Sequence, residues 1–182
     1  MFITIPTRFD RDLIWPRIEA CKQVAELVIV HTEPGHDDVP EVVNVRDYSR
    51  SIQHWWNSGL DRCSGPTLVL NDDIVAAPED LATMLEELTR ADVVYLAGHR
   101  VGHATPLTGW CYGIHPDRIR PDTDFQWWGG DDDLFKRAVR DGLTISALHL
   151  PIEHRRGEAA FHDPIHAAMA HEDMKLLAER WP

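Results

Sequence analysis

Two adjacent carboxylates, Asp72 and Asp73, follow the apolar run at residues 67–70 and precede Pro78, a favoured first residue of a helix. Neighbouring negative charges repel each other unless a cation lies between them. Mg²⁺ and Mn²⁺ bind carboxylates and keep coordination positions for substrate phosphate oxygens. The pair therefore indicates either a divalent-metal site for a phosphate-bearing ligand or an Asx turn between a strand and a helix.

A second acidic run, Asp131, Asp132 and Asp133, lies in the segment WWGGDDDLFKR at residues 127–137. Glycine lets the backbone approach a ligand closely, and carboxylates at a helix N-terminus tend to stay ionised in the field of the helix dipole. An ionised carboxylate can accept a proton, so the run contains a candidate general base. Charge complementarity at a helix start is the alternative, but three consecutive acids exceed what capping requires.

Histidine and tryptophan offer further functional groups. His149 and His154 flank the end of a predicted strand, where a neutral imidazole could complete a metal shell begun by Asp73. The chain also contains seven tryptophans, which provide stacking surfaces for flat rings or sugars.

Composition limits the class of protein. A chain of 182 residues is long enough for one buried core, and a net charge of −12 disfavours broad binding to nucleic acid or anionic lipid. The start of the chain does not resemble a signal peptide, and no apolar run approaches the length of a membrane helix. We therefore expect a soluble, cytoplasmic protein without a membrane partner. The three cysteines are far apart, which predicts buried free thiols.

The elements that position these groups alternate between strand and helix in the first half of the chain. Apolar, β-rich runs predict four strands, and between them lie a helix at residues 15–23 with Pro16 in its first turn, a helix capped by Ser49, and a helix starting at Pro78. This alternation predicts an α/β fold with a mainly parallel sheet covered on both faces. Ligands bind such sheets beyond the carboxyl ends of the strands, where Asp72 and Asp73 stand. The predicted strands are residues 2–5, 26–33, 41–45 and 67–74.

The pattern changes near residue 98. Aromatic strand material at 106–121, a helix opened by the three acids and ending at Gly142, a strand at 143–152 and a final helix at 164–180 capped by Asp163 follow. We interpret this part as an insertion on the same core. The expected organisation is a single compact domain, with a nucleotide-binding half at 1–97 and an acceptor and catalytic half at 98–182.

Taken in order, these segments resemble the GT-A fold nucleotide-sugar glycosyltransferases, of the family 2-like type, over nearly the whole chain. FITIPTR at 2–8 resembles the opening strand and Pro-Thr turn, and residues 53–74 resemble the Asn-bearing helix and the strand that ends in an Asp-x-Asp type motif. WWGGDDDLFKRAVRDGLTI at 127–145 is similar to the Trp-Gly-Gly-acidic motif of β-1,4-galactosyltransferase-like enzymes.

The resemblance implies a Rossmann-like GT-A fold and assigns roles around the metal and the base. Asp73 corresponds to the metal ligand, completed by His154 or His149, and Asp131 to the catalytic base, with Asp132 as the alternative because Gly130 stands where the family has Glu. Asp72 is expected at the ribose or diphosphate. The remaining donor-site residues implied by the resemblance are Pro6, Thr7, Arg8, Glu33, Asn57, Gly130, Trp128 with Trp127, and Arg155 or Arg156.

The implied activity is that of a metal-dependent hexosyltransferase, inverting, which uses Mn²⁺ or Mg²⁺ to transfer a sugar from a UDP-sugar to a hydroxyl. Glu33 replaces the usual acid that reads uracil, so the nucleobase stays open. The acceptor also stays open among a saccharide, a small molecule, a protein and a modified DNA base. The rival interpretations are a nucleotidyltransferase on a related fold and a non-catalytic carbohydrate-binding protein.

Overall fold

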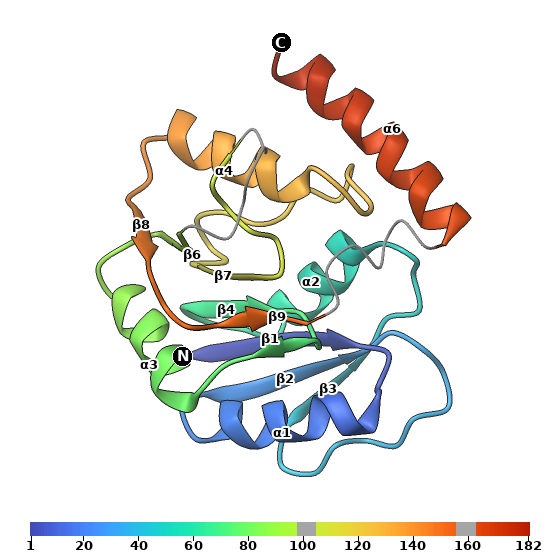
Figure 1. The fold of residues 1–182 in the computed structure, drawn as a ribbon, viewed down its shortest axis with the longest axis vertical. Coiled ribbons are helices and arrows are strands. Elements are labelled where there is room, and N and C mark those ends of the chain that lie inside the picture. Colours follow the sequence, from blue (N-terminus) through green and yellow to red (C-terminus); the bar gives the residue numbers. More distant parts are fainter. Residues whose placement is uncertain (98–104, 156–162) are drawn as a thin grey trace.

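A seven-stranded sheet forms the centre of the protein, in the strand order β3-β2-β1-β4-β7-β6-β8, and a two-stranded sheet pairs β5 with β9 (Figure 1). The computed structural model describes residues 1–97, 105–155 and 163–182. The strands are β1 (Phe2–Thr7), β2 (Glu26–His31), β3 (Val43–Arg46), β4 (Thr67–Leu70), β5 (Ile74–Val75), β6 (Val93–Leu96), β7 (Cys111–Ile114), β8 (Ile145–Leu148) and β9 (Glu153–His154). The helices are α1 (Arg11–Lys22), α2 (Ile52–Leu60), α3 (Pro78–Glu87), α4 (Gly130–Arg140) and α6 (Pro164–Arg180).

The sheet is mostly parallel. β1 lies between β2 and β4 and is parallel to both, β2 is parallel to β3, and β6 is parallel to β8. β7 runs antiparallel to its neighbours β4 and β6. The expected α/β class in a single compact domain is therefore confirmed, and the aromatic strand material after residue 105 forms the antiparallel strand.

Alternating side chains of the central strands form the two faces of the core. Ile3 and Ile5 of β1 pack in the cluster that includes α1 and α3, whereas Val28 and Val30 of β2 pack with Trp55 of α2. α4 covers the same side as α2, through the cluster that joins Leu134 to Trp56 and Tyr112. Because successive strand residues point to opposite faces, near-continuous apolar runs are what a sheet covered on both sides requires.

Two helix boundaries differ from the sequence-based expectation. α1 begins at Arg11, so Pro16 lies inside the helix and not in its first turn. The N-cap of α2 is Ser51, not Ser49, since the Ser51 hydroxyl accepts a hydrogen bond from the backbone N–H of His54 at 3.3 Å. Ser49 was a plausible cap because its residue type fits; the position of the first turn against the sheet decides between the two serines.

The later helices agree more closely with the sequence. α3 starts at Pro78, and the Asp163 carboxylate caps α6 by accepting the backbone N–H of Ile165 at 2.8 Å. α4 ends before Gly142, which has φ +70°. The strand expected at 143–152 is shorter, because β8 ends at Leu148 and the chain crosses to β9.

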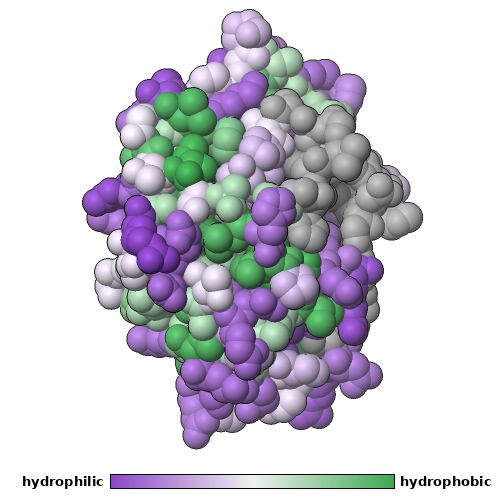
Figure 2. Space-filling model, turned by 60° about the vertical axis from the view of Figure 1, so that its left-hand side comes forward, coloured by the Kyte–Doolittle hydropathy of each residue, from purple (hydrophilic) through white to green (hydrophobic). Residues whose placement is uncertain are grey.

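The hydropathy of the surface and the burial of the cysteines can be compared with the expectations from composition. Figure 2 shows a face on which hydrophilic side chains predominate and hydrophobic ones form small scattered groups. In the described ranges, no helix has the length and apolar character to span a membrane. Cys21, Cys63 and Cys111 are free and buried, and burial raises the pKa of Cys21 to about 12.

Replacing Ser51 with alanine tests the boundary of α2. Ser51→Ala should lower the free energy of unfolding by about 1 kcal/mol, because the capping hydroxyl is lost. Ser49→Ala is the matched control: the Ser49 hydroxyl caps no backbone N–H of α2 and interacts with the Asp47 carboxylate, so its loss should cost less stability than the loss of the Ser51 cap. Urea unfolding followed by circular dichroism measures both, and a larger loss for Ser49→Ala would contradict the assigned cap.

Candidate active site

Asp72 joins the turn after β4 to the end of β1. One of its carboxylate oxygens, Oδ2, accepts a hydrogen bond from the Thr7 hydroxyl at 2.9 Å and one from the backbone N–H of Arg8 at 3.3 Å. Burial raises the pKa of Asp72 and the neighbouring charge of Asp73 adds to the shift, although the hydrogen bond from Thr7 opposes it. Asp72 therefore lies among the donor-site residues expected at the end of the first strand.

Asp73 lies against His154. Pairing of β5 with β9 sets Ile74 opposite His154, and the backbone N–H of Arg155 donates to the carbonyl of Asp73 at 3.0 Å. The imidazole Nε2 of His154 is 3.0 Å from Oδ1 of Asp73. This pairing selects His154 as the neighbour of Asp73, whereas His149 is exposed in the segment after β8.

The electrostatic surroundings keep Asp73 ionised. Burial by itself would raise the pKa of Asp73, but the His154 imidazole and the charge of Arg17 outweigh burial, and the pKa is lowered. Oδ1 of Asp73 is buried and, within the described residues, accepts no hydrogen bond of good geometry, even though His154 is close. A buried carboxylate oxygen without a donor is unfavourable unless a cation or water contacts it.

Arg17 is a cation that the sequence interpretation missed. It is 8% exposed on α1, and its guanidinium Nε donates to the carbonyl of Ile74, the residue after Asp73. Burial lowers the pKa of Arg17, while the charges of Asp72 and Asp73 oppose that change. Part of the repulsion between the two acids is thus offset by the protein itself. The apolar spacing of α1 carries no signal that would single out this arginine.

The three acids of the second run have different surroundings. Asp133 is fully buried and bonded by Arg137 Nε at 2.6 Å, and Asp132 is 4% exposed and accepts the Thr105 hydroxyl at 2.5 Å. Asp131 is partly exposed at the first turn of α4, and one of its oxygens accepts the backbone N–H of Asp132 at 3.1 Å. Solvent access favours Asp131 over Asp132 as the group that meets a ligand.

Position 130 leaves no room for a side chain in this chain. A Cβ atom at this position would lie 2.3 Å from the Gln53 side-chain nitrogen, so the Gln53 amide occupies the space that a side chain at 130 would need. Gln53 is 1% exposed on α2. In this chain the Gln53 side chain of α2 therefore contacts α4 at the position where the resembled motif has Glu.

A short connection joins Asp131 to the pair of Asp73 and His154. The Asp131 carboxylate lies against Gly109, where an added Cβ would be 2.9 Å from Oδ2. The next residue, Trp110, stacks on His154 with ring centroids 5.0 Å apart and an interplanar angle of 7°. The two acidic motifs are almost sixty residues apart in sequence, and both are therefore linked to the segment at 109–110.

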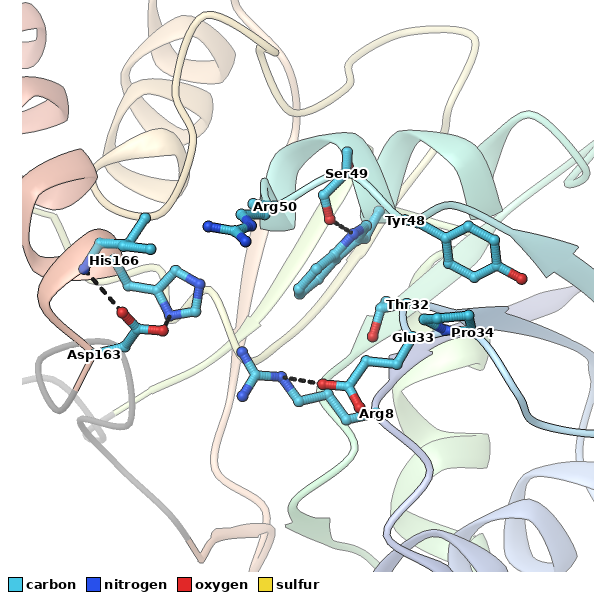
Figure 3. Close-up of a pocket in the computed structure, with 11 residues that line it drawn as sticks. Arg8, Thr32, Glu33, Pro34, Tyr48, Ser49, Arg50, Asp163 and His166 are labelled. Carbon is cyan, nitrogen blue, oxygen red and sulfur yellow. Dashed lines mark hydrogen bonds and ion pairs between the residues drawn. The ribbon is translucent and has the colours of Figure 1, made fainter.

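A cavity of about 400 Å³ opens where β1, β2 and β3 end (Figure 3). Arg8, Arg50 and His166 point toward its interior, and an ion pair of 3.7 Å joins Arg8 to Glu33. Pro6 is buried in β1 beneath this edge of the sheet. The remaining lining residues are Thr32, Pro34, Tyr48, Ser49, Trp55, Asp163 and Ile165.

Other expected donor-site residues lie elsewhere. The Asn57 amide donates to the carbonyls of Gln53 and Pro121, both at 2.9 Å, so it ties α2 to the loop before α4 and is not part of the cavity lining described above. Trp128 is partly buried just before α4, and the Arg155 side chain is exposed beside Asp73. Arg156 lies outside the described residues.

The Asp73 and His154 pair fits a hard divalent cation that is completed by a ligand. In the described ranges no group of three or more His, Cys, Asp or Glu side chains is arranged to hold a metal. Mg²⁺ in nucleotide sites is commonly held by one or two carboxylates together with substrate phosphates and water. The ionised carboxylate is the type of ligand that suits Mn²⁺ or Mg²⁺, and the imidazole 3.0 Å from it would take a second position.

Comparison with known proteins shows the fold. No family model and no curated protein sequence matches the chain. Residues 1–349 of S. aureus TarS match with a TM-score of 0.59 and 12% identity, over 81% of this chain and 57% of that one. A second TarS structure matches with a TM-score of 0.57 and 12% identity, over 81% of this chain and 35% of its own.

A hypothetical transferase from Thermus thermophilus is similar in size as well as fold. It matches with a TM-score of 0.54 and 16% identity, over 82% of this chain and 92% of that one. The chain therefore spans only part of TarS and nearly all of the Thermus protein. At these identities the likeness establishes a fold shared with transferases, and the expected GT-A-like fold class is confirmed.

The two neighbouring acids should respond oppositely to neutralisation. At pH 7 in a chelating buffer, Asp72→Asn should leave stability unchanged or increase it, because the folded-state pKa of Asp72 is raised above its ordinary value of 3.8 and ionisation there opposes folding. Asp73→Asn should destabilise, because the folded-state pKa of Asp73 is lowered and its ionisation favours folding.

The same argument sets the pH window. The stability that Asp73 contributes is present above its ordinary pKa of 3.8 and is lost as pH falls through the lowered folded-state value. Urea unfolding from pH 7 down to pH 3 should therefore show the gap between the two variants narrowing at the acidic end. Equal destabilisation by both substitutions at pH 7 would contradict the electrostatic assignment.

Proposed function

We propose that the protein is a metal-dependent, inverting glycosyltransferase that transfers a sugar from a nucleotide-sugar, in the first instance a UDP-sugar, to an acceptor hydroxyl. The observation that carries the proposal is that the Asp131 carboxylate lies against Gly109, while the next residue, Trp110, stacks on His154, the neighbour of Asp73. Such a transfer needs an ionised carboxylate that accepts a proton, close to a site that binds a diphosphate. The fold shared with the Thermus transferase is consistent with it.

The donor nucleotide is assigned to the cavity at the ends of β1, β2 and β3. Its volume of about 400 Å³ lies within the range of small-molecule sites. Arg8, Thr32 and Glu33 supply polar groups in its lining, and Pro6 and Thr7 precede Arg8 at the end of β1. Asp72, bonded to Thr7, then lies on the path from the nucleoside to the diphosphate.

Asp73 and His154 would hold Mn²⁺ or Mg²⁺. When bound, the cation supplies positive charge that stabilises the departing diphosphate. The exposed guanidinium of Arg155, next in sequence to His154, adds charge on the same side. Arg17 of α1 binds the carbonyl of Ile74, and its charge acts on both Asp72 and Asp73.

Asp131 is the proposed base. It removes the proton of the acceptor hydroxyl as that oxygen forms a bond to the anomeric carbon and the bond from the same carbon to the diphosphate oxygen breaks. Asp132, held by Thr105, orients the first turn of α4, and Trp127 and Trp128 offer the sugar or acceptor a flat surface. On this proposal residues 1–97 bind the nucleotide and residues 98–182 provide the acceptor side and the base.

A donor screen tests the proposal. Thermal shift with UDP-glucose, UDP-galactose and related donors, with and without Mn²⁺, should show stabilisation that grows with donor concentration and requires the metal. Slow hydrolysis of the stabilising donor should accompany it. Release of pyrophosphate from a nucleoside triphosphate instead would favour a nucleotidyltransferase. Metal-independent sugar binding without hydrolysis of any donor would favour a carbohydrate-binding protein.

Replacing the proposed base should separate binding from turnover. Asp131→Asn should keep the donor dissociation constant within about threefold of wild type and lower the transfer rate by at least about 100-fold, since general-base catalysis contributes about that much. Asp141→Asn is the control, because Asp141 is an exposed acid at the other end of α4 paired with Arg140. Isothermal titration and steady-state kinetics measure the two quantities; equal losses of binding and turnover would remove Asp131 from this role.

A further inference from the structure

The C-terminal helix α6 contacts the proposed site at three places along its length. Its first turn lines the donor cavity, its middle bonds the loop before α4, and its C-terminal end bonds the first turn of α4. The sequence motifs give α6 no role beyond its Asp163 cap. Its contacts indicate a function in arranging the site.

Asp173, in the middle of α6, is the strongest of these contacts. Its carboxylate accepts the backbone N–H groups of three consecutive residues: Gln126 at 3.0 and 3.1 Å, Trp127 at 2.6 Å and Trp128 at 2.9 Å. Asp173 is 2% exposed. A buried carboxylate is tolerated when several donors surround it, and charged acceptors form the stronger hydrogen bonds. Asp173 therefore binds every backbone N–H of the loop at 126–128 from the α6 side.

That loop leads directly to the proposed base. Gly129 follows with φ +69°, α4 begins at Gly130, and Asp131 is the second residue of the helix. α6 also packs against Gly129, where an added Cβ would lie 3.3 Å from Leu177 Cδ2. A shift of the loop would therefore move the first turn of α4 and the carboxylate of Asp131.

The last turn of α6 holds α4 from the other side of Asp131. The guanidinium Nη1 of Arg180 lies 3.3 Å from an oxygen of Asp133, and the indole N–H of Trp181, just after the helix, donates to the same oxygen at 2.9 Å. Asp131 is thus placed between one segment bonded by Asp173 and one residue bonded by the end of the same helix.

The first turn of α6 connects this arrangement to the donor cavity. His166, which lines the cavity with Asp163 and Ile165, packs on the ring of Trp127 with centroids 4.0 Å apart at 40°. The indole N–H of Trp127 donates to the carbonyl of Arg50, another lining residue, at 2.7 Å. Figure 3 shows His166 and Asp163 on the α6 side of the cavity, opposite Glu33 and Tyr48.

We propose that α6 couples the donor cavity to the catalytic base, with Asp173 as the positioning residue that fixes the loop before Asp131 and His166 as the residue that senses an occupied cavity through Trp127. The proposal rests on the proposed function for its kinetic consequence. Neither residue contacts the reacting atoms. A small misplacement of a catalytic group can cost about 100-fold in rate, so a positioning residue can matter as much as one that contacts substrate.

Asp173→Asn tests the positioning role. Asparagine keeps one acceptor oxygen and the size of the side chain but removes the charge. The expected result is a kcat at least about tenfold lower, with the donor dissociation constant and KM changed less than about threefold and faster hydrogen exchange at the amides of residues 126–128. The matched control is Glu172→Gln, an exposed neighbour that pairs with Lys175 on the outer face of α6 and should match wild type in all three measurements.

His166→Gln tests the coupling and serves if Asp173→Asn does not fold. It should weaken donor binding and change the donor-induced Trp fluorescence, and donor binding to wild type should slow exchange at residues 126–128. Unchanged exchange in Asp173→Asn, an unchanged kcat, or a donor that leaves the loop amides of wild type unaffected would overturn the proposal. If wild type neither binds nor turns over any donor, the proposed function is rejected. Amide hydrogen exchange at residues 126–128 of Asp173→Asn, measured without donor, would still show whether Asp173 holds this loop.

Discussion

The antiparallel pairing of β5 with β9 is the contact on which the candidate site depends. It joins the turn after β4 to a segment eighty residues later, and it sets the His154 imidazole 3.0 Å from the Asp73 carboxylate. Asp73 alone would be a strand-end acid facing repulsion from Asp72. The imidazole and Arg17 change that balance and lower the pKa of Asp73, so the carboxylate stays ionised beside the imidazole that stacks on Trp110.

Asp72 and Asp73 are chemically identical, but their positions shift their pKa values in opposite directions. Asp72 is bonded to the end of β1 and has a raised pKa because burial dominates, whereas Asp73 has a lowered pKa because cationic neighbours dominate. The same division appears in the second acidic run. Asp133 accepts hydrogen bonds from Arg137 and Trp181, and Asp132 accepts one from Thr105. Asp131 alone of the three is partly exposed. In the second run the structural contacts fall on the two buried carboxylates, Asp132 and Asp133.

The C-terminal helix α6 and the edge of the sheet both arrange the candidate site. Parallel strands bring β1, β2, β3 and β4 to a common carboxyl edge, which accounts for the cavity and the Asp72–Asp73 turn. The proposed base comes from α4; α6 binds the loop before that helix through Asp173 and its first turn through Arg180. The proposed donor side therefore depends on sheet geometry and the proposed base on helix packing, with Trp127 and His166 in contact between them.

The sequence by itself determined the α/β class, the strands at the front of the chain, the starts of α3 and α6, and the acids that end β4 and open α4. These features are local: apolar periodicity, Pro at a first helical turn and Asp at a cap act within a few residues of each other. Tertiary structure decided between Ser49 and Ser51 as a cap and placed His154, not His149, beside Asp73. It also set the Asn57 amide against the carbonyls of Gln53 and Pro121. It also introduced Arg17 and Asp173, because buried charges acquire their roles only from partners that the fold brings from distant parts of the chain.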